Sequence, residues 1–201
     1  MLPWAAFGVG CVLAMAAPSP VRAAAPTAAL VSDIDPSRAH TEFSLRVAWV
    51  RRISGRFDFI QGQVRQHADR QHFDVDIAIA AQSLSMDNPD HAAWARSEEF
   101  FDAERHPWVR FRARDVPMHI LHTGGRLIGW LTLRGQEGAA DFEITPSTCP
   151  DPGFGCAVEA EGEISRSHFG LNARRWVVSD KVQLKLSFSL RDADSASDPG
   201  H

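Results

Sequence analysis

Apolar and polar side chains alternate along most of this chain, and that period of two most constrains its fold. The clearest runs are residues 43–49, 73–79 and 182–190, in which every second side chain is large and apolar. Successive side chains of a β-strand point to opposite faces. Each run therefore predicts a strand with one buried and one solvated face.

Shorter alternating segments extend this pattern and bring the expected number of strands to about eight. They lie at residues 56–60, 109–113, 126–133, 140–144 and 158–164, and turn sequences such as Thr123-Gly124-Gly125 and Asp87-Asn88-Pro89 separate most of them. A sandwich or a closed barrel would suit such strands, and closure has the advantage of removing unpaired edges. Residues 90–103 break the alternation and predict a short helix, capped by Asp90 and ended before Pro107.

The two ends of the chain differ in composition from the middle. Residues 4–17 form an apolar run that small residues follow, which predicts a signal peptide over residues 1–25 and a periplasmic or secreted protein. The run is shorter than the roughly 20 residues of a membrane span, and a buried N-terminal helix is the alternative. Residues 191–201 lack large apolar side chains and are expected to be disordered. One domain over residues 26–190 remains.

The charge balance excludes some partners. The formal net charge is −4, with 21 Lys and Arg against 25 Asp and Glu. A mildly acidic protein has little overall attraction for nucleic acid or anionic lipid headgroups. We therefore expect no nucleic-acid partner and no stable membrane insertion after signal cleavage.

Two cysteines flank a turn-rich loop. Cys149 and Cys156 enclose Pro150-Asp151-Pro152-Gly153-Phe154-Gly155, which would bring two strand ends together. In an oxidising compartment this spacing predicts a disulfide worth roughly 2–3 kcal/mol. Half of a metal site and two free thiols are the competing interpretations.

Three motifs in fixed order identify a family resemblance. They are Ser97 to Asp102 with His106-Pro107, Leu131-Thr132-Leu133-Arg134-Gly135, and Ile164 to Leu171, with Gly55-x-Phe57 upstream. From about Ser32 to Leu190 the chain resembles the YceI-like family of bacterial polyisoprenoid-binding proteins. The resemblance implies an exported protein with an extended, lipocalin-like antiparallel β-barrel and a short helical crossover whose paired aromatics close the barrel. The barrel interior would hold a polyisoprenoid or other lipid tail, such as that of a quinone, a prenyl phosphate or a fatty acid.

The inward parity of the strands nominates residues that would line such an interior. The expected ligand-binding residues are Phe43, Leu45, Val47, Trp49, Phe57, Phe59, Val75, Ile77, Ile79, Phe100, Phe101, Leu184, Leu186 and Phe188. In a filled barrel the same side chains would be core. Relatives commonly carry a His where this chain has Val47, so no headgroup contact carries over there. Arg51, Arg52 and Arg56 would pair with a phosphate headgroup or lie in a solvated turn.

Recognisable catalytic constellations are missing from the sequence. His168 follows Ser167, and His119 and His122 are three residues apart, but no carboxylate or third ligand has a recognisable spacing to them. We therefore expect a binding protein without enzymatic activity and without a cofactor other than its lipid. A metal-binding or hydrolytic stress factor that uses these His residues is the alternative, a structural module with a filled core is another, and a homodimer is left open.

Overall fold

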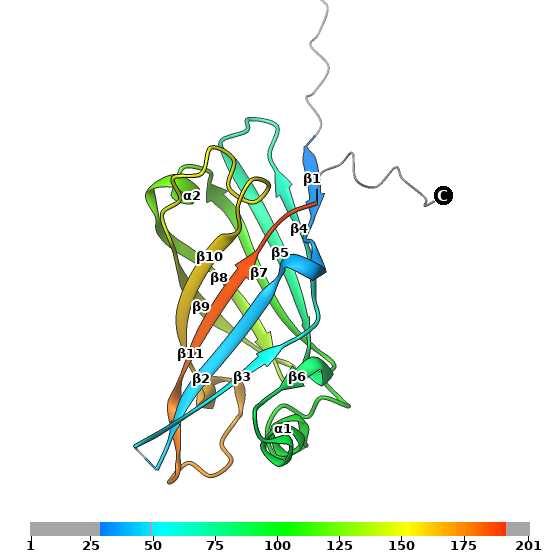
Figure 1. Ribbon diagram of the computed structural model, residues 1–201, viewed down its shortest axis with the longest axis vertical. Coiled ribbons are helices and arrows are strands. Elements are labelled where there is room, and N and C mark those ends of the chain that lie inside the picture. The colour runs from blue at the N-terminus through cyan, green and yellow to red at the C-terminus, as the bar shows by residue number, and fades with distance from the viewer. Residues whose placement is uncertain (1–28, 49, 192–201) are drawn as a thin grey trace, which may run out of the picture.

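A single antiparallel sheet of eleven strands forms the framework of the protein. The computed structural model describes residues 29–48 and 50–191 (Figure 1). The strand order in the sheet is β1-β4-β5-β7-β8-β9-β10-β11-β2-β3-β6. The elements are β1 Leu30–Asp33, η1 Pro36–Arg38, β2 His40–Val47, β3 Arg51–Phe57, β4 Ile60–Gln66, β5 His72–Ala80, η2 Ala81–Ser83, β6 Leu84–Ser85, α1 Pro89–Arg96, β7 Trp108–Pro117, α2 Ile120–Thr123, β8 Gly125–Leu133, β9 Gln136–Ile144, β10 Val158–Ser165, η3 Arg166–Phe169 and β11 Val178–Phe188.

The sheet curls into an extended barrel around one core, as expected for a lipocalin-like fold. Figure 1 shows α1 at the lower end and α2 at the upper end. At the upper end, the chain beyond β1 crosses to the chain beyond β11. Ile34 forms an isolated antiparallel bridge with Leu190, and the amide of Arg191 donates to the carbonyl of Asp33 at 2.8 Å. These contacts join the β1 edge of the sheet to the chain that follows β11.

Alternation directs one face of each long strand into the core. In β5, Phe73, Val75 and Ile77 are buried, and in β2 the buried apolar residues are Phe43 and Leu45. Gly55 of β3 stands opposite Phe43 in the register. A β-carbon at Gly55 would lie 2.7 Å from the Phe43 ring, so the glycine makes room for that ring.

Three local expectations are corrected by the structure. The expected strand at residues 56–60 is two strands, because β3 ends at Phe57 and β4 begins at Ile60. Together with the short β1 and β6, this split raises the strand count from eight to eleven. Helix α1 is shorter than expected and begins with Asn88, whose side chain accepts hydrogen bonds from the amides of Asp90 and His91. A proline at the first helical position also favours that start.

The expected disulfide between Cys149 and Cys156 is not formed. Both are free, half-buried cysteines, and the thiol of Cys156 lies 3.4 Å from the hydroxyl oxygen of Ser147. Hydrogen bonding between the two thiols raises the pKa of Cys149 and lowers the pKa of Cys156. Backbone bonds hold the loop instead, including one from Gly153 N to Cys156 O at 2.8 Å.

The expected signal peptide and C-terminal tail lie outside the described residues. Within residues 29–48 and 50–191, every helix is too short or too polar to cross a membrane.

Candidate functional site

An apolar cavity lies inside the barrel. Its volume is about 70 Å³, well below the roughly 300–1,000 Å³ of typical ligand pockets. Its lining comes from β2, β3, β5, β7, β8, β9, β10 and β11 and from the segments that follow α1 and η3. The lining residues are Thr41, Phe43, Leu45, Phe57, Ile77, Ile79, Phe100, Phe101, Val109, Phe111, Leu131, Leu133, Phe142, Ile164, Arg166, Leu171, Val182, Leu184, Lys185 and Leu186.

Four phenylalanines, which we call the aromatic plug, close the lower part of this cavity. The plug consists of Phe43, Phe57, Phe100 and Phe101, all buried. Phe101 stands edge-on to Phe57 at 5.7 Å and to Phe100 at 5.1 Å between ring centroids. Such edge-to-face pairs contribute about 0.5–1.5 kcal/mol each beyond their buried area. The plug is therefore a well-packed cluster, in which two rings from the α1–β7 segment pack against two rings of β2 and β3.

A second cavity, the mouth cavity, lies between the β2–β3 hairpin, α1 and the start of β11. Its volume is about 360 Å³, and its lining includes Val47, Ile53, Trp94 and Val177. Phe43, Leu45 and Phe100 line both cavities. Phe100 packs on Trp94 at 5.2 Å between ring centroids. The Phe100 ring thus stands between the interior cavity and the mouth cavity.

Arg166 brings a charge to the wall of the interior cavity. The side chain is 2% exposed, and its guanidinium lies 6.0 Å from the centre of the Phe100 ring. It donates to the carbonyls of Leu171, Ala173, Val178 and Ser179. Burial lowers the pKa of Arg166. These four carbonyls satisfy the buried cation and fix the loop between η3 and β11.

The sequence motifs meet around the plug. Arg134 donates to the carbonyl of Glu98 at 2.9 Å, which joins the β8–β9 turn to the segment after α1. In the same turn, Gly135 has a positive φ of 72°, and a β-carbon there would lie 2.9 Å from the His106 ring. Arg166 of the third motif adjoins Phe100 of the first. Three distant stretches of sequence therefore build one structure, which positions Phe100 and Phe101.

The structure brings most of the predicted ligand-binding residues together. Those that line the interior cavity are Phe43, Leu45, Phe57, Ile77, Ile79, Phe100, Phe101, Leu184 and Leu186. Val47 lines the mouth cavity instead, and Val75 and Phe188 are buried beside neither cavity. Phe59 is 43% exposed and packs on Trp108 outside the barrel, because it lies in the turn between β3 and β4. Trp49 falls outside the described residues.

Several lining residues were missed in the sequence. Val109, Phe111, Leu131 and Leu133 lie on strands that the alternation did predict, so the same parity argument identifies them. Thr41 and Arg166 could not be identified this way, because both are polar residues on the buried side. The hydroxyl oxygen of Thr41 is buried without a hydrogen-bond partner.

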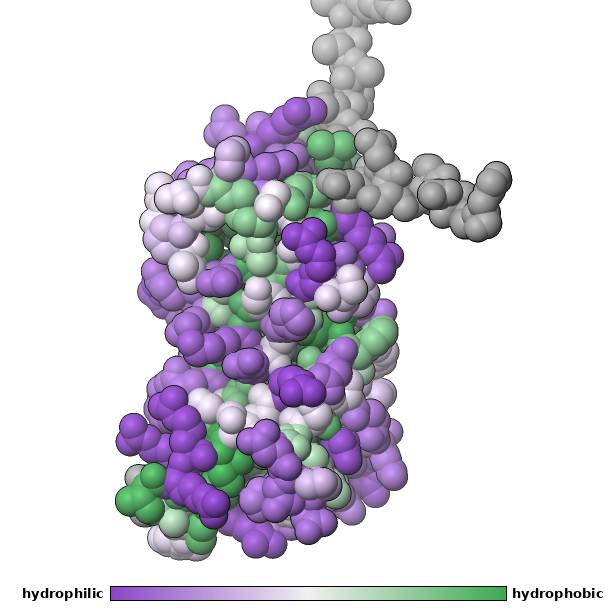
Figure 2. Space-filling model, viewed as in Figure 1, coloured by the Kyte–Doolittle hydropathy of each residue, from purple (hydrophilic) through white to green (hydrophobic). Residues whose placement is uncertain are grey.

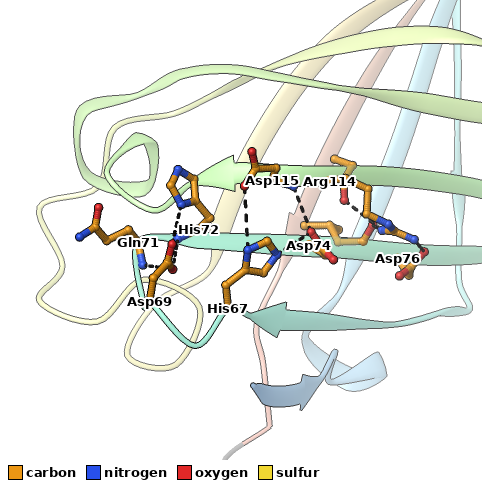
Figure 3. A network of polar contacts seen from close by, with 10 residues as sticks. His67, Asp69, Gln71, His72, Asp74, Asp76, Arg114 and Asp115 are labelled. Atoms are coloured by element: carbon orange, nitrogen blue, oxygen red, sulfur yellow. Dashed lines mark hydrogen bonds and ion pairs between the residues drawn. The ribbon is translucent and has the colours of Figure 1, made fainter. Parts of the chain in front are cut away.

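His67 and His72, at the upper end, belong to a polar network that Figure 3 shows, in and around the β4–β5 turn. His67 Nε2 lies 2.9 Å from Asp74 Oδ1, and His72 Nδ1 lies 3.1 Å from Asp69 Oδ2. The hydrogen bond to Asp69 raises the pKa of His72. Asp74 also accepts from the amide of Asp115, whose φ is 53°. These contacts account for the His67 and His72 pair as a structural network.

The other histidines are dispersed. His119 and His122 lie one turn apart at α2, where both are exposed, and His168 is exposed on η3. No three His, Cys, Asp or Glu side chains within residues 29–48 and 50–191 are grouped to hold a metal ion. Apolar contact rather than acid–base chemistry is what the interior cavity offers.

Comparison with known proteins places the chain in a family. The model of the YceI-like domain matches residues 33–190, which is most of the chain. The chain belongs to the YceI-like family. No curated protein shows a significant sequence match to it.

Solved structures share the fold. BcnA of Burkholderia cenocepacia superposes with a TM-score of 0.64 at 18% identity, over 77% of this chain and 98% of that chain. A polyisoprenoid-binding domain from Saccharophagus degradans, implicated in plant cell wall breakdown, gives 0.56 at 13% identity, over 79% and 95%. The YceI protein of Campylobacter jejuni gives 0.54 at 20% identity, over 71% and 87%. At these identities the likeness concerns the fold.

Proposed function

We propose that this protein binds a long-chain lipid, with a polyisoprenoid as the first choice, inside its barrel for transport or storage. The observation that carries the proposal is the interior cavity, whose lining is almost entirely apolar and comes from eight strands. Each methylene of a lipid tail moved from water into such an interior contributes about 0.8 kcal/mol. A binding role without catalysis also agrees with the family and with the polyisoprenoid-binding domain among the structural neighbours.

Size places a condition on this proposal. The interior cavity of about 70 Å³ is too small for a whole prenyl chain, while the adjoining mouth cavity offers about 360 Å³. A tail therefore enters from the mouth and displaces Phe100, one of the three side chains that line both cavities. Phe100 acts as a gate in this proposal, and the barrel widens as it fills.

One polar group in the cavity wall suits the weakly polar parts of such a ligand. Thr41 Oγ1 is buried and unpartnered in the cavity wall, and a buried hydroxyl without a partner costs about 1–3 kcal/mol. A quinone carbonyl or an ether oxygen of the ligand would satisfy it. A fatty acid or amide is the alternative ligand class.

The test is extraction of the purified protein with organic solvent, followed by mass spectrometry. Leu184 lines the cavity and is only half-buried, so Leu184→Trp should occupy ligand space without an impossible overlap. Its neighbour Gln183 is exposed on the outer face, so Gln183→Trp is the matched control. We expect the wild type and Gln183→Trp to release a long-chain lipid and Leu184→Trp to release several-fold less.

Two results would contradict the proposal. One is the absence of any stoichiometric lipid from folded wild-type protein, together with no uptake of an added prenyl or acyl chain. The other is an unchanged lipid load in folded Leu184→Trp. A periplasmic or secreted location is part of the proposal and depends on residues 1–25, which lie outside the described residues.

A further inference from the structure

The lower end of the barrel carries an exposed apolar tip. Val50 is 90% exposed, Trp176 is 91% exposed and Val177 is 47% exposed, and we call these three residues the apolar tip. Val50 lies in the β2–β3 hairpin, and the other two lie just before β11. The two segments adjoin, because the amide of Ala48 donates to the carbonyl of Val177 at 2.7 Å. Figure 2 shows hydrophobic atoms at this lower corner, beside hydrophilic ones.

The backbone under Trp176 is fixed rather than loose. The amides of Val177 and Val178 both donate to the carbonyl of Arg174 at 2.9 Å. The guanidinium of Arg174 lies 5.3 Å from the centre of the Trp94 ring and 3.1 Å from Glu99 Oε1. A tight turn that contacts α1 therefore keeps the Trp176 indole exposed to solvent. Contacts within the described chain do not explain why a large apolar side chain stands there.

The segments that carry the apolar tip are rich in arginine, although the whole chain is acidic. Residues 43–57 and 164–179 contain seven arginines and no Asp or Glu, in a chain with 25 acids. Of these seven, Arg166 is buried, and Arg56 and Arg174 are paired with Asp58 and Glu99. Among the described residues, Arg46, Arg51, Arg52 and Arg175 form no ion pair. Arg46 and Arg52 even stand opposite each other in the β2–β3 register. Like charges in such a pair are destabilising, so the cluster is suited to an external anion.

We propose that the apolar tip and these arginines dock the protein on an anionic phospholipid surface. Trp and apolar side chains favour the boundary between headgroups and acyl chains, while each nearby arginine gains about 1 kcal/mol from an anionic surface. The tip adjoins the mouth cavity, which Val47, Arg174 and Val177 line. Docking would therefore bring the mouth cavity to the bilayer surface. A role of the apolar tip in lipid exchange rests on the proposed lipid binding.

The experiment is sedimentation of the purified protein with vesicles of phosphatidylcholine alone or mixed with phosphatidylglycerol in equal parts. We expect binding to the mixed vesicles, little binding to the neutral ones, and weakening by salt. Trp176→Ala should lower partitioning about tenfold or more, because an indole buries roughly 150–250 Å². Arg51→Gln and Arg52→Gln should each lower it about fivefold, which corresponds to about 1 kcal/mol.

Matched controls lie elsewhere on the barrel. Trp130 is 55% exposed on the outer face of β8, and Arg65 is exposed on β4 without an ion pair to another described residue. Trp130→Ala and Arg65→Gln should bind vesicles as the wild type does. Equal losses for Trp130→Ala and Trp176→Ala, or equal binding to neutral and anionic vesicles, would overturn the proposal.

A second copy of the chain is the competing occupant. Size-exclusion chromatography with light scattering separates the two cases. Suppose that the wild type is a dimer, that Trp176→Ala makes it monomeric, and that the substitution leaves vesicle binding unchanged. The apolar tip would then be a dimer interface, and the docking proposal would be wrong. Vesicle binding needs no internal cargo, so a protein that docks but yields no lipid on extraction would refute the proposed function and leave the docking intact.

Discussion

The two ends of the barrel differ in whether their basic side chains are paired with carboxylates. At the upper end, His67 and His72 each face an aspartate within about 3.1 Å, and Asp115 joins the same network. At the lower end, Arg51 and Arg52 have no carboxylate in their own segment, and their hairpin adjoins the segment that carries the exposed Trp176. The two histidines at the upper end are thus paired with carboxylates of their own turn and its strands. At the lower end Arg51 and Arg52 form no ion pair with another described residue, and the mouth cavity lies beside their hairpin.

This contrast shows that one strand pattern can serve two purposes. The alternation that buries Phe73 at the upper end also directs Phe43 into the plug at the lower end. What differs is the set of connecting segments. The β4–β5 turn is short and carries one Asp and one Arg. At the opposite end, the segment after α1 brings Phe100 and Phe101, and the segment after η3 brings two arginines and Trp176.

The largest effect is expected from removing one buried ring at each end of the barrel. Phe100→Ala and Phe73→Ala each remove a buried ring and should each lower the free energy of unfolding by about 3–5 kcal/mol. Only Phe100→Ala also opens the passage between the cavities, so only it should speed the uptake of a fluorescent long-chain fatty acid. Denaturant titration and stopped-flow fluorescence measure the two quantities. If both variants sped uptake equally, Phe100 would not be a gate.

A smaller effect is expected from added bulk at the lower end. Gly55→Ala places a methyl group 2.7 Å from the Phe43 ring and should lower the free energy of unfolding by about 1–3 kcal/mol. Phe43→Leu in the same chain should make the alanine nearly neutral, because the crowded ring is gone. A double-mutant cycle by thermal unfolding gives the coupling. Additive losses would mean that Met86, whose Cγ would lie 2.8 Å from the added methyl group, limits the space at Gly55 rather than Phe43.

The smallest effect concerns pH at the upper end. The hydrogen bond to Asp69 raises the pKa of His72 above its usual value of about 6.5. The stabilisation from protonated His72 is therefore complete below about pH 6.5 and is lost as the pH rises through the raised pKa. His72→Gln should flatten the change in urea midpoint over that window. If the urea midpoint of the variant changed with pH as much as that of the wild type, the pH dependence would belong to another titrating group.

The fold was largely readable from the sequence, while the site was readable only in part. Period-two patterning located the long strands and most of the side chains around the cavity, because a strand with one buried face has a fixed parity. Phe59 was misassigned because β3 ends at Phe57, and alternation carries no signal for a turn between two apolar runs. Arg166 escaped because its burial depends on carbonyls of residues 171–179, a tertiary arrangement without a local pattern.

The bridge between Ile34 and Leu190 has a consequence for how the protein folds. It joins residues near the two ends of the domain, and β2 pairs with β11 across more than a hundred residues. Contacts so distant in sequence slow folding, because a long stretch of chain must be ordered before they form. The barrel can close only after the ribosome has released its last strand. Until then the nascent chain exposes its apolar faces, and chaperones would have time to bind it.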